Sequence, residues 1–222
     1  MHRLLISLIL LSSVHAEPIK INLITTNDMH GMIGEQKANF MNPQYPPTII
    51  GGAAFSKYMD ELRVEIQSIK EGLLLLDGGN FFQGSPLGMV DDGKTMIKWM
   101  NRIGYDGMVP GSYDFISGAA NLNELSKMAT FPFLYSNLNC NNCPLVDSNI
   151  KPYIIREISG IKVGILGIVN SQLSELALAE NLSGTDADKE VLNVRKWVPK
   201  MKVKGAELII VLTSSGVPWD RE

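Results

Sequence analysis

Short apolar runs recur along the chain, and most of them end at glycine, serine, asparagine or aspartate. Runs of this length that are rich in isoleucine, leucine and valine predict buried β-strands. Polar turns at the carboxyl ends of such strands are the places where open α/β sheets carry their chemistry. The predicted strands cover residues 19–26, 73–76, 107–109, 132–135, 162–169 and 207–213.

Helical periodicity separates several of these runs. Between the first two, apolar side chains recur at spacings of three and four, which predicts an amphipathic helix whose apolar stripe packs on a sheet. Further helices are predicted over residues 95–102, 121–129 and much of 186–198, where Pro199 should end or kink the last one. Strands that alternate with helices indicate an α/β fold. The first stripe consists of Phe55, Tyr58, Met59, Leu62, Ile66 and Ile69.

The amino-acid composition and the net charge indicate a single domain and argue against a nucleic-acid partner. The chain has 222 residues, of which 45% are hydrophobic, enough for one core of single-domain size. Its formal net charge of -3 gives no overall basic field, so we expect no nucleic-acid partner. A basic cluster on and after the last predicted helix admits a phosphate-binding interpretation, but a solvated helix face is favoured. The cluster comprises Arg195, Lys196, Lys200, Lys202 and Lys204.

The first sixteen residues have the pattern of a signal peptide. Arg3 gives a positive start, residues 4–11 are apolar, and Val14-His15-Ala16 fits a small-x-small cleavage site. We therefore expect export to a periplasmic or extracellular location, with residues 17–222 as the mature part. An uncleaved anchor is the alternative, although the apolar run is far shorter than the roughly 20 residues of a membrane-spanning helix. No integral membrane segment is expected after cleavage.

The only two cysteines, Cys140 and Cys143, lie in the loop-like string SNLNCNNCP. In an oxidising compartment such a pair favours a small local disulfide. A redox or metal-binding CxxC is the competing interpretation, but a structural zinc site needs four ligands and the chain has no second pair.

The turn NDMHG after the first strand places Asp28 and His30 two residues apart. A carboxylate and an imidazole at the end of one strand can face one divalent metal ion. The alternative is structural, because aspartate often caps a turn and a histidine is often simply at the surface.

Three later turns repeat this arrangement. The run LLLL leads into DGGNFFQGSP, where paired glycines allow a sharp turn and Asp77 and Asn80 follow the strand. The strings GSYDFISG and IIVLTSSG add two more polar turns, which are ordinary loops unless their order is meaningful.

The order of these turns resembles the 5'-nucleotidase branch of the calcineurin-like metallophosphoesterases. Members of that family carry, in order, NDxHG, D(A/G)GDxxQG(T/S)P, GNH(E/D)FDxG and a strand that ends in SHxG. The resemblance implies a layered sandwich of mixed β-sheets flanked by helices. It also implies two divalent metals about 3.5 to 4 Å apart that bind a phosphate and supply a hydroxide for in-line attack.

The resemblance implies a site from which several metal ligands have been replaced. Asp28 and His30 occupy two ligand positions of the first metal, whereas the carboxylate that bridges both metals falls at Asn80. The asparagine that holds the second metal becomes Ser112, and a further metal-binding histidine becomes Ser214. Zinc, manganese or a similar ion is expected, at one site rather than two.

The catalytic pair implied by the resemblance is absent. The histidine that contacts the substrate phosphate becomes Tyr113, and the aspartate that orients it becomes Ile116, so no catalytic residue is assigned. Asp114 matches the acidic position that follows the family histidine in the motif, and the resemblance places it at the pocket. Asp77 is placed there too, and a shift of its loop by three residues would let it replace the bridging acid.

The sequence thus predicts a metal-dependent phosphomonoester hydrolase that acts weakly on nucleotides. The alternative is a non-catalytic exported relative that serves as a nucleotide-binding or interaction domain, or a truncated gene product. The family adds one more strand and loop and then a separate substrate-binding domain, which we do not find within residues 17–222.

Overall fold

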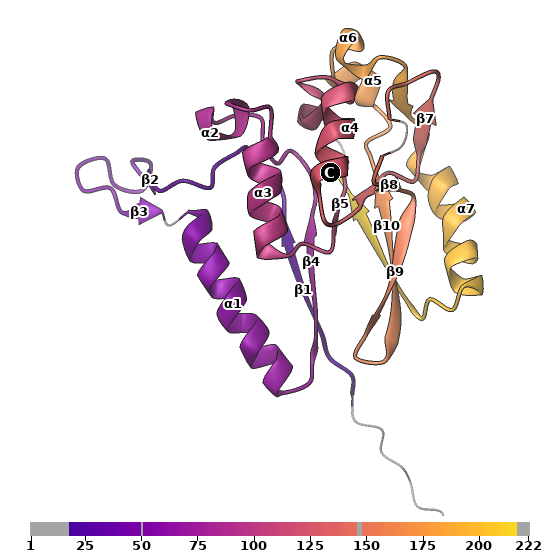
Figure 1. Cartoon of the computed structure of the whole chain (residues 1–222), viewed down its shortest axis with the longest axis horizontal. Coiled ribbons are helices and arrows are strands. Elements are labelled where there is room, and N and C mark those ends of the chain that lie inside the picture. Colours follow the sequence, from indigo (N-terminus) through magenta and orange to yellow (C-terminus); the bar gives the residue numbers. More distant parts are fainter. Residues whose placement is uncertain (1–17, 50, 146–147, 217–222) are drawn as a thin grey trace, which may run out of the picture.

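The structure, a computed structural model, describes residues 18–49, 51–145 and 148–216. Two β-sheets form the centre of the molecule, and helices cover their outer faces (Figure 1). The larger sheet is parallel throughout, with the strand order β1-β4-β5-β6-β8. Its strands are β1 (Ile21–Thr26), β4 (Gly72–Asp77), β5 (Gly107–Met108), β6 (Phe133–Leu134) and β8 (Ile150–Lys151).

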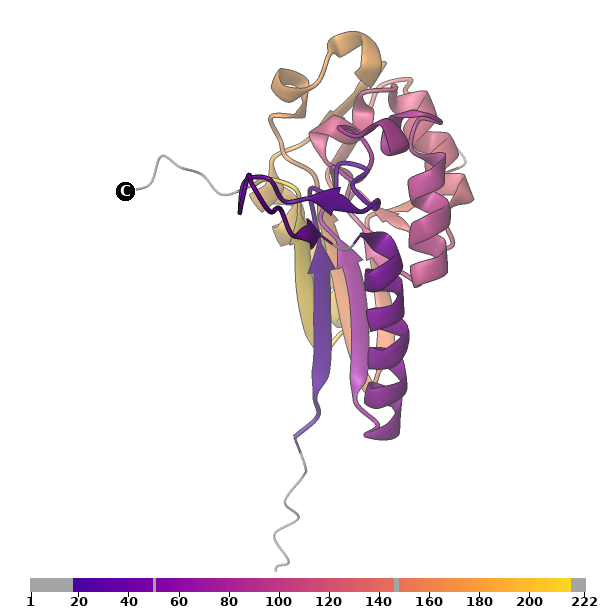
Figure 2. The same cartoon turned by 90° about the vertical axis from the view of Figure 1, so that its left-hand side faces the viewer.

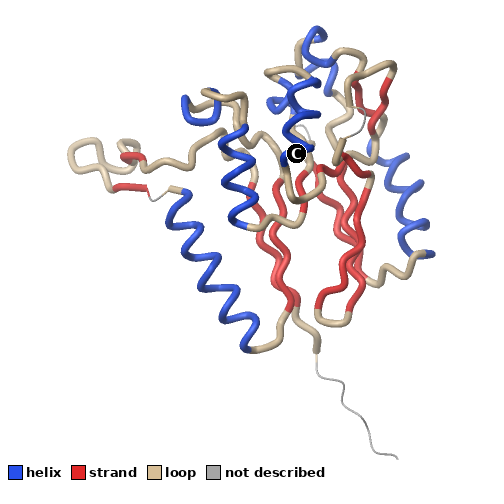
Figure 3. Tube along the Cα trace, in the orientation of Figure 1, coloured by secondary structure: helices blue, strands red, loops and turns tan. Residues whose placement is uncertain are grey.

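The second sheet has the order β12-β10-β9 and mixes both directions of pairing. β12 (Leu208–Thr213) runs parallel to β10 (Ile161–Ile168), and β9 (Tyr153–Ile158) runs antiparallel to it. The two sheets lie against each other as layers in the view turned by 90° (Figure 2), and the tube view shows the strands at the centre with helices on both sides (Figure 3). Two small antiparallel pairs complete the strands, namely β7 (Leu138–Cys140) with β11 (Thr185–Ala187) and β2 (Gln36–Lys37) with β3 (Thr48–Ile49).

Helices on both sides make the layered α/β sandwich that the resemblance implied, so this expectation is confirmed. α1, α3 and α4 lie on the outer side of the larger sheet, and α7 lies on the far side of the second sheet (Figure 1). The helices are α1 (Gly52–Ser68), α2 (Pro86–Met89), α3 (Lys94–Ile103), α4 (Ala119–Met128), α5 (Leu173–Leu176), α6 (Ala179–Leu182) and α7 (Glu190–Val203), with a 3-10 turn η1 at Ser112–Phe115. None of the helices in the described part is long and apolar enough to cross a membrane.

The predicted strands and helices are all present, and the structure corrects three details. α7 continues through Pro199 to Val203, although a helix end or kink was predicted there. Met201 is fully buried against Leu166 and Ile168 of β10, and this packing holds the second half of the helix in place. The helix continues because proline removes only one backbone hydrogen-bond donor, and the residues before and after Pro199 still pack on the sheet.

The apolar stripe of α1 is only partly core. Met59 and Ile66 are buried, whereas Tyr58 and Ile69 are each 54% exposed, so their assignment to the core was wrong. The sheet touches a narrower strip of the helix than the spacing of apolar residues indicates. β9 was not predicted at all, because its sequence YIIREI shows no clean alternation, although Ser159-Gly160 directly after it is a turn signal.

A disulfide joins Cys140, the last residue of β7, to Cys143, and their Cα atoms are 5.3 Å apart. β7 pairs through Cys140 with Thr185 of β11. The predicted signal peptide, residues 1–16, lies outside the described residues.

The two sheets approach each other most closely where β10 crosses β6. A Cβ atom added at Gly167 would overlap the backbone and side chain of Leu134. The backbone N–H of Ser136 also donates to the carbonyl oxygen of Gly167 at 2.9 Å. The carboxyl ends of strands from both sheets are therefore held at one edge of the sandwich, where the candidate site lies.

Gly167→Ala should lower the free energy of unfolding by about 1 to 3 kcal/mol, because the added methyl group overpacks the contact between the sheets. Urea unfolding followed by circular dichroism measures this change. Gly34→Ala is the matched control, since no atom lies within 4 Å of the added methyl group there. Equal stability of the two variants would contradict the close contact of the sheets.

Candidate functional site

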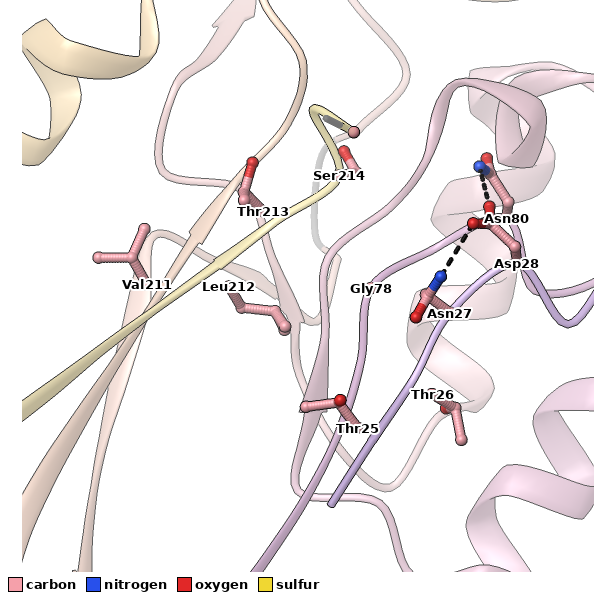
Figure 4. A pocket seen from close by; sticks show the side chains of 11 residues that line it. Thr25, Thr26, Asn27, Asp28, Gly78, Asn80, Val211, Leu212, Thr213 and Ser214 are labelled. Atoms are coloured by element: carbon pink, nitrogen blue, oxygen red, sulfur yellow. Dashed lines mark hydrogen bonds between the residues drawn. The ribbon is translucent and has the colours of Figure 1, made fainter. Parts of the chain in front are cut away.

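The turns after β1, β4 and β12 converge on one pocket with a cavity of about 360 Å³ (Figure 4). Asp28 and Asn80 lie on one side of it, and Ser214 lies on the other side, at the end of β12. The sequence had placed all three at a common site, and the fold brings them together. The remaining lining comes from Thr25, Thr26, Asn27, Gly78, Val211, Leu212, Thr213 and Gly216.

Backbone hydrogen bonds join the NDMHG and DGGNFFQGSP turns directly. The N–H of Asp28 donates to the carbonyl oxygen of Gly79 at 2.9 Å, and the N–H of His30 donates to that of Asn80 at 3.0 Å. Asp28, His30 and Asn80 all have positive φ angles, of 51°, 50° and 57°. Aspartate, asparagine and histidine adopt this conformation more readily than other non-glycine residues, and the hydrogen bonds between the turns hold it here. The paired turns thus fix the position of each side chain that the sequence singled out.

The side-chain amide of Asn80 binds the carboxylate of Asp28. Its Nδ2 donates to Asp28 Oδ1 at 2.7 Å, and its Oδ1 accepts the backbone N–H of Tyr113 at 3.1 Å. Because a backbone N–H can only donate, the atom of Asn80 that faces it is the oxygen, and the atom that faces Asp28 is the nitrogen. Asn27 donates to the other carboxylate oxygen, Oδ2, at 2.9 Å.

Two amide groups therefore hold one carboxylate, an arrangement that we call the amide clamp (Asn27, Asp28 and Asn80). The hydrogen bond from Asn80 lowers the pKa of Asp28 below its ordinary value, although partial burial opposes the change. Asp28 is consequently an anion at neutral pH, and its charge is balanced by amide hydrogen atoms.

His30 lies close to this clamp but is not among the described residues that line the pocket. Its Nδ1 lies 2.6 Å from the carbonyl oxygen of Gln83, which can only accept, so the proton is on Nδ1. The lone pair of the neutral ring is then on Nε2. The ring of Tyr113 packs edge-on to the imidazole with a centroid distance of 5.8 Å.

Asp77 and Asp114 are completely buried beneath the pocket rather than in its lining. Asp114 accepts the backbone N–H groups of Asn80, Phe81 and Gly111 at 2.8 to 2.9 Å, so it holds the two turns together. Asp77 accepts from Gly79 N–H at 2.9 Å and from the hydroxyl of Thr26 at 2.6 Å. Neither carboxylate is directed at the cavity.

The other replaced positions lie around this centre. Ser214 Oγ is buried without a hydrogen-bond partner in the described part of the structure. Ser112 is in η1 and does not line the pocket. Ile116 is 39% exposed, and its carbonyl oxygen accepts from Asn181 rather than from a pocket group.

The donor set does not fit a pair of divalent metals. Among the described residues, no group of three or more histidine, cysteine, aspartate or glutamate side chains could hold a metal ion. Asn80 presents an N–H group, not a lone pair, toward Asp28, so it cannot share a cation with that carboxylate as it stands. Neutral serine hydroxyls are poor replacements for anionic or imidazole ligands.

Sequence reasoning missed two contributors to the site. Asn27 is the second amide of the clamp, and its adjacency to Asp28 was a usable signal. Tyr105 accepts or donates a hydrogen bond of 2.9 Å with Thr26, which in turn binds Asp77. Nothing in the local sequence indicates that Tyr105 reaches this position.

Comparison with known proteins agrees with the fold. The chain is 29% identical over 198 residues to a 5'-nucleotidase of Vibrio cholerae, which covers 89% of this chain and 34% of the relative. A 5'-nucleotidase precursor from Thermus thermophilus superposes with a TM-score of 0.76 at 23% identity, over 86% of this chain and 36% of that protein. The calcineurin-like phosphoesterase YfkN from Bacillus subtilis superposes with a TM-score of 0.69 at 21% identity, over 92% of this chain and 64% of that protein.

These matches decide the relationship. The chain is a homologue of the 5'-nucleotidases. No family model matches it. This 5'-nucleotidase homologue spans about a third of the length of the curated relatives that it matches, and its fold is that of the calcineurin-like phosphoesterases. That family consists of metallophosphoesterases, which use divalent metals.

The buried carboxylate of Asp77 should make the stability of the homologue pH-dependent. Burial raises the pKa of Asp77 to about 8, against hydrogen bonds from Thr26 and Gly79 that lower it. The folded protein then retains a proton that the unfolded chain releases near pH 4. The stability that Asp77 contributes is therefore greatest below about pH 4 and falls as the pH rises toward 8, by at most about 1.4 kcal/mol per pH unit.

Asp77→Asn should flatten this dependence and make the protein more stable than the wild type at pH 8. Urea unfolding between pH 5 and pH 8 measures the slope. Asp114, whose pKa is raised to about 7 by burial, contributes in the same direction and leaves a residual slope in the variant. Parallel slopes for the wild type and Asp77→Asn would rule out a buried proton on Asp77.

Asn80→Asp should destabilise the homologue in EDTA by about 1 kcal/mol, because two carboxylates then face each other without a donor. Manganese or zinc should restore the melting temperature of this variant and leave that of the wild type unchanged. Asn39→Asp, at an exposed loop position, controls for the added charge. A wild-type protein that is stabilised by either metal as strongly as the variant would contradict the clamp.

Proposed function

We propose that this chain is an exported phosphoesterase domain of the 5'-nucleotidase type in which hydrolysis of nucleotide phosphomonoesters is strongly impaired. The observation that carries the proposal is the amide clamp. Asp28 is the one carboxylate among the described residues that line the pocket, and amide hydrogens already occupy both of its oxygens.

Hydrolysis of a phosphomonoester needs positive charge near the phosphoryl oxygens, because negative charge accumulates there in the transition state. The described pocket lining contains no lysine or arginine. An incoming phosphate therefore meets the Asp28 anion without a compensating cation. Loss of a single stabilising donor costs on the order of a hundredfold to a thousandfold in rate, and here several are replaced.

The chain's own residues retain part of a binding site. Asn27, Thr213 and Ser214 are amide and hydroxyl residues of the cavity lining. These neutral groups suit the hydroxyl and amide functions of a nucleoside better than a phosphate dianion. A non-catalytic binding domain is thus the second candidate, and the polar cavity of about 360 Å³ is the observation that favours it.

The organisation of the protein is part of the same proposal. Residues 1–16 are proposed to act as a signal peptide that directs the chain to a periplasmic or extracellular compartment. Residues 17–222 are proposed to form the metallophosphoesterase-like part, and the disulfide between Cys140 and Cys143 is consistent with an oxidising compartment.

Phosphate release from AMP and from p-nitrophenyl phosphate, in the presence of manganese or zinc, tests the proposal. We expect the wild type and Asp28→Ala to release phosphate at the same background rate, at least about a thousandfold below an active 5'-nucleotidase assayed alongside. Calorimetric titration with adenosine and with AMP then tests the binding role, with adenosine expected to bind at least as tightly. Phosphate release that approaches the active enzyme and is lost in Asp28→Ala would refute impairment.

A further inference from the structure

The outer side of the second sheet carries a concentration of positive charge. Residues 189–204 contain six basic side chains and one acidic side chain, although the whole chain has a net charge of -3. The ion pairs within the described ranges involve the lysines at positions 20, 57 and 127, and none of the lysines of α7. The cations of this helix are therefore available to a partner.

Three of these lysines form a row. Lys196, Lys200 and Lys204 recur at intervals of four, which places them on one side of α7 and its C-terminal cap, about 6 Å apart. The ammonium groups of Lys196 and Lys200 lie 5.0 and 4.6 Å from the centre of the Trp197 ring. The ammonium group of Lys204 lies 5.4 Å from the centre of the Tyr153 ring.

The row borders a groove of about 460 Å³ whose floor is aromatic and aliphatic. The rings of Tyr153 and Trp197 pack together with a centroid distance of 5.5 Å. The indole N–H donates to the carbonyl oxygen of Ser136 at 3.0 Å, which fixes the ring in place. Val203, at the rim, is 89% exposed. An apolar floor beneath a cationic rim thus faces solvent.

The groove adjoins a free strand edge. Tyr153 belongs to the groove and also begins β9, the last strand in the order β12-β10-β9. Within the described part of the chain, the backbone of β9 pairs only with β10. An edge strand of this kind presents backbone N–H and C=O groups that another strand can pair with.

We propose that this face, formed by β9 and the lysine row of α7, binds an extended acidic segment of another polypeptide by strand addition. The segment pairs with the edge of β9, sets one apolar side chain against Tyr153 and Trp197, and directs carboxylates at the lysines. Side chains on one face of a strand recur about every 6.6 to 6.8 Å, close to the spacing of the lysine row. The charge of the rim selects an acidic partner.

The geometry favours a peptide over a lipid surface. Tyr153 and Trp197 are partly buried in the groove and do not project from it. Aromatic side chains that anchor a protein to a bilayer must reach into the headgroup layer. A strand edge also offers paired donors and acceptors, which match a peptide backbone.

Fluorescence anisotropy with a labelled heptapeptide tests the proposal on the full chain. The probe has glutamate at its second and sixth positions, phenylalanine at the fourth and threonine or valine elsewhere. We expect saturable binding that weakens with salt. The triple variant Lys196→Gln, Lys200→Gln and Lys204→Gln should bind about tenfold more weakly, because the ion pairs to the two glutamates of the probe are lost. Lys202→Gln, on the opposite side of the helix, should bind like the wild type.

Backbone methylation of the probe at alternate nitrogens separates strand addition from simple charge attraction. Methylation should abolish binding, since it removes the donors that pair with β9. Equal binding of the methylated probe, or an equal loss in Lys202→Gln, would overturn the proposal. Two further results would overturn it. If the protein sediments with phosphatidylglycerol vesicles and does not bind the peptide, the face serves a membrane. If the wild type forms a dimer that the triple variant does not form, the face binds a second copy of this chain.

Discussion

Parallel pairing of β1 with β4 is the constraint on which the site depends. Thr26 pairs with Asp77 at the carboxyl ends of these strands, and the turns that follow continue the pairing through backbone hydrogen bonds. Because the chain leaves both strands on the same edge, Asp28 and Asn80 must emerge within reach of each other. Aspartate and asparagine tolerate the left-handed conformation better than most residues, and the pairing of the turns holds Asp28 and Asn80 in it.

Of the three carboxyl groups near the pocket, two are buried and stabilise the turns, and one lies at the pocket surface. Asp77 and Asp114 are buried and accept hydrogen bonds from the turns, so they stabilise the frame, and burial raises the pKa of each. Asp28 remains at the pocket with a lowered pKa. Two of the three carboxylates therefore stabilise the turns, and only Asp28 lies at the pocket. The site keeps the architecture of a phosphoesterase, but it offers few ligands to a cation.

Much of the fold could be predicted from the sequence, because apolar runs and helical spacings determine where strands and helices form. The convergence of Asp28, Asn80 and Ser214 also followed from their places after successive strands. The orientation of the Asn80 amide could not be predicted, since it depends on the backbone N–H of Tyr113, which is 33 residues away in sequence. For the same reason, the sequence could place Asp77 and Asp114 near the pocket but could not show that backbone groups surround them.

The electrostatic contrast between the pocket and the groove follows from the same arrangement of sheets. The pocket has an anion at its edge, and its described lining has no basic side chain, whereas the groove has a row of cations along its rim. The pocket lies at the carboxyl ends of β1, β4 and β12, and the groove is lined by residues of α7 and its C-terminal cap and by Tyr153 of the edge strand β9. Exposed charges separated by more than the Debye length of about 10 Å at 0.1 M salt are largely screened from each other. An acidic ligand is therefore directed by local charge to the groove, and a neutral polar ligand can occupy the pocket independently of it.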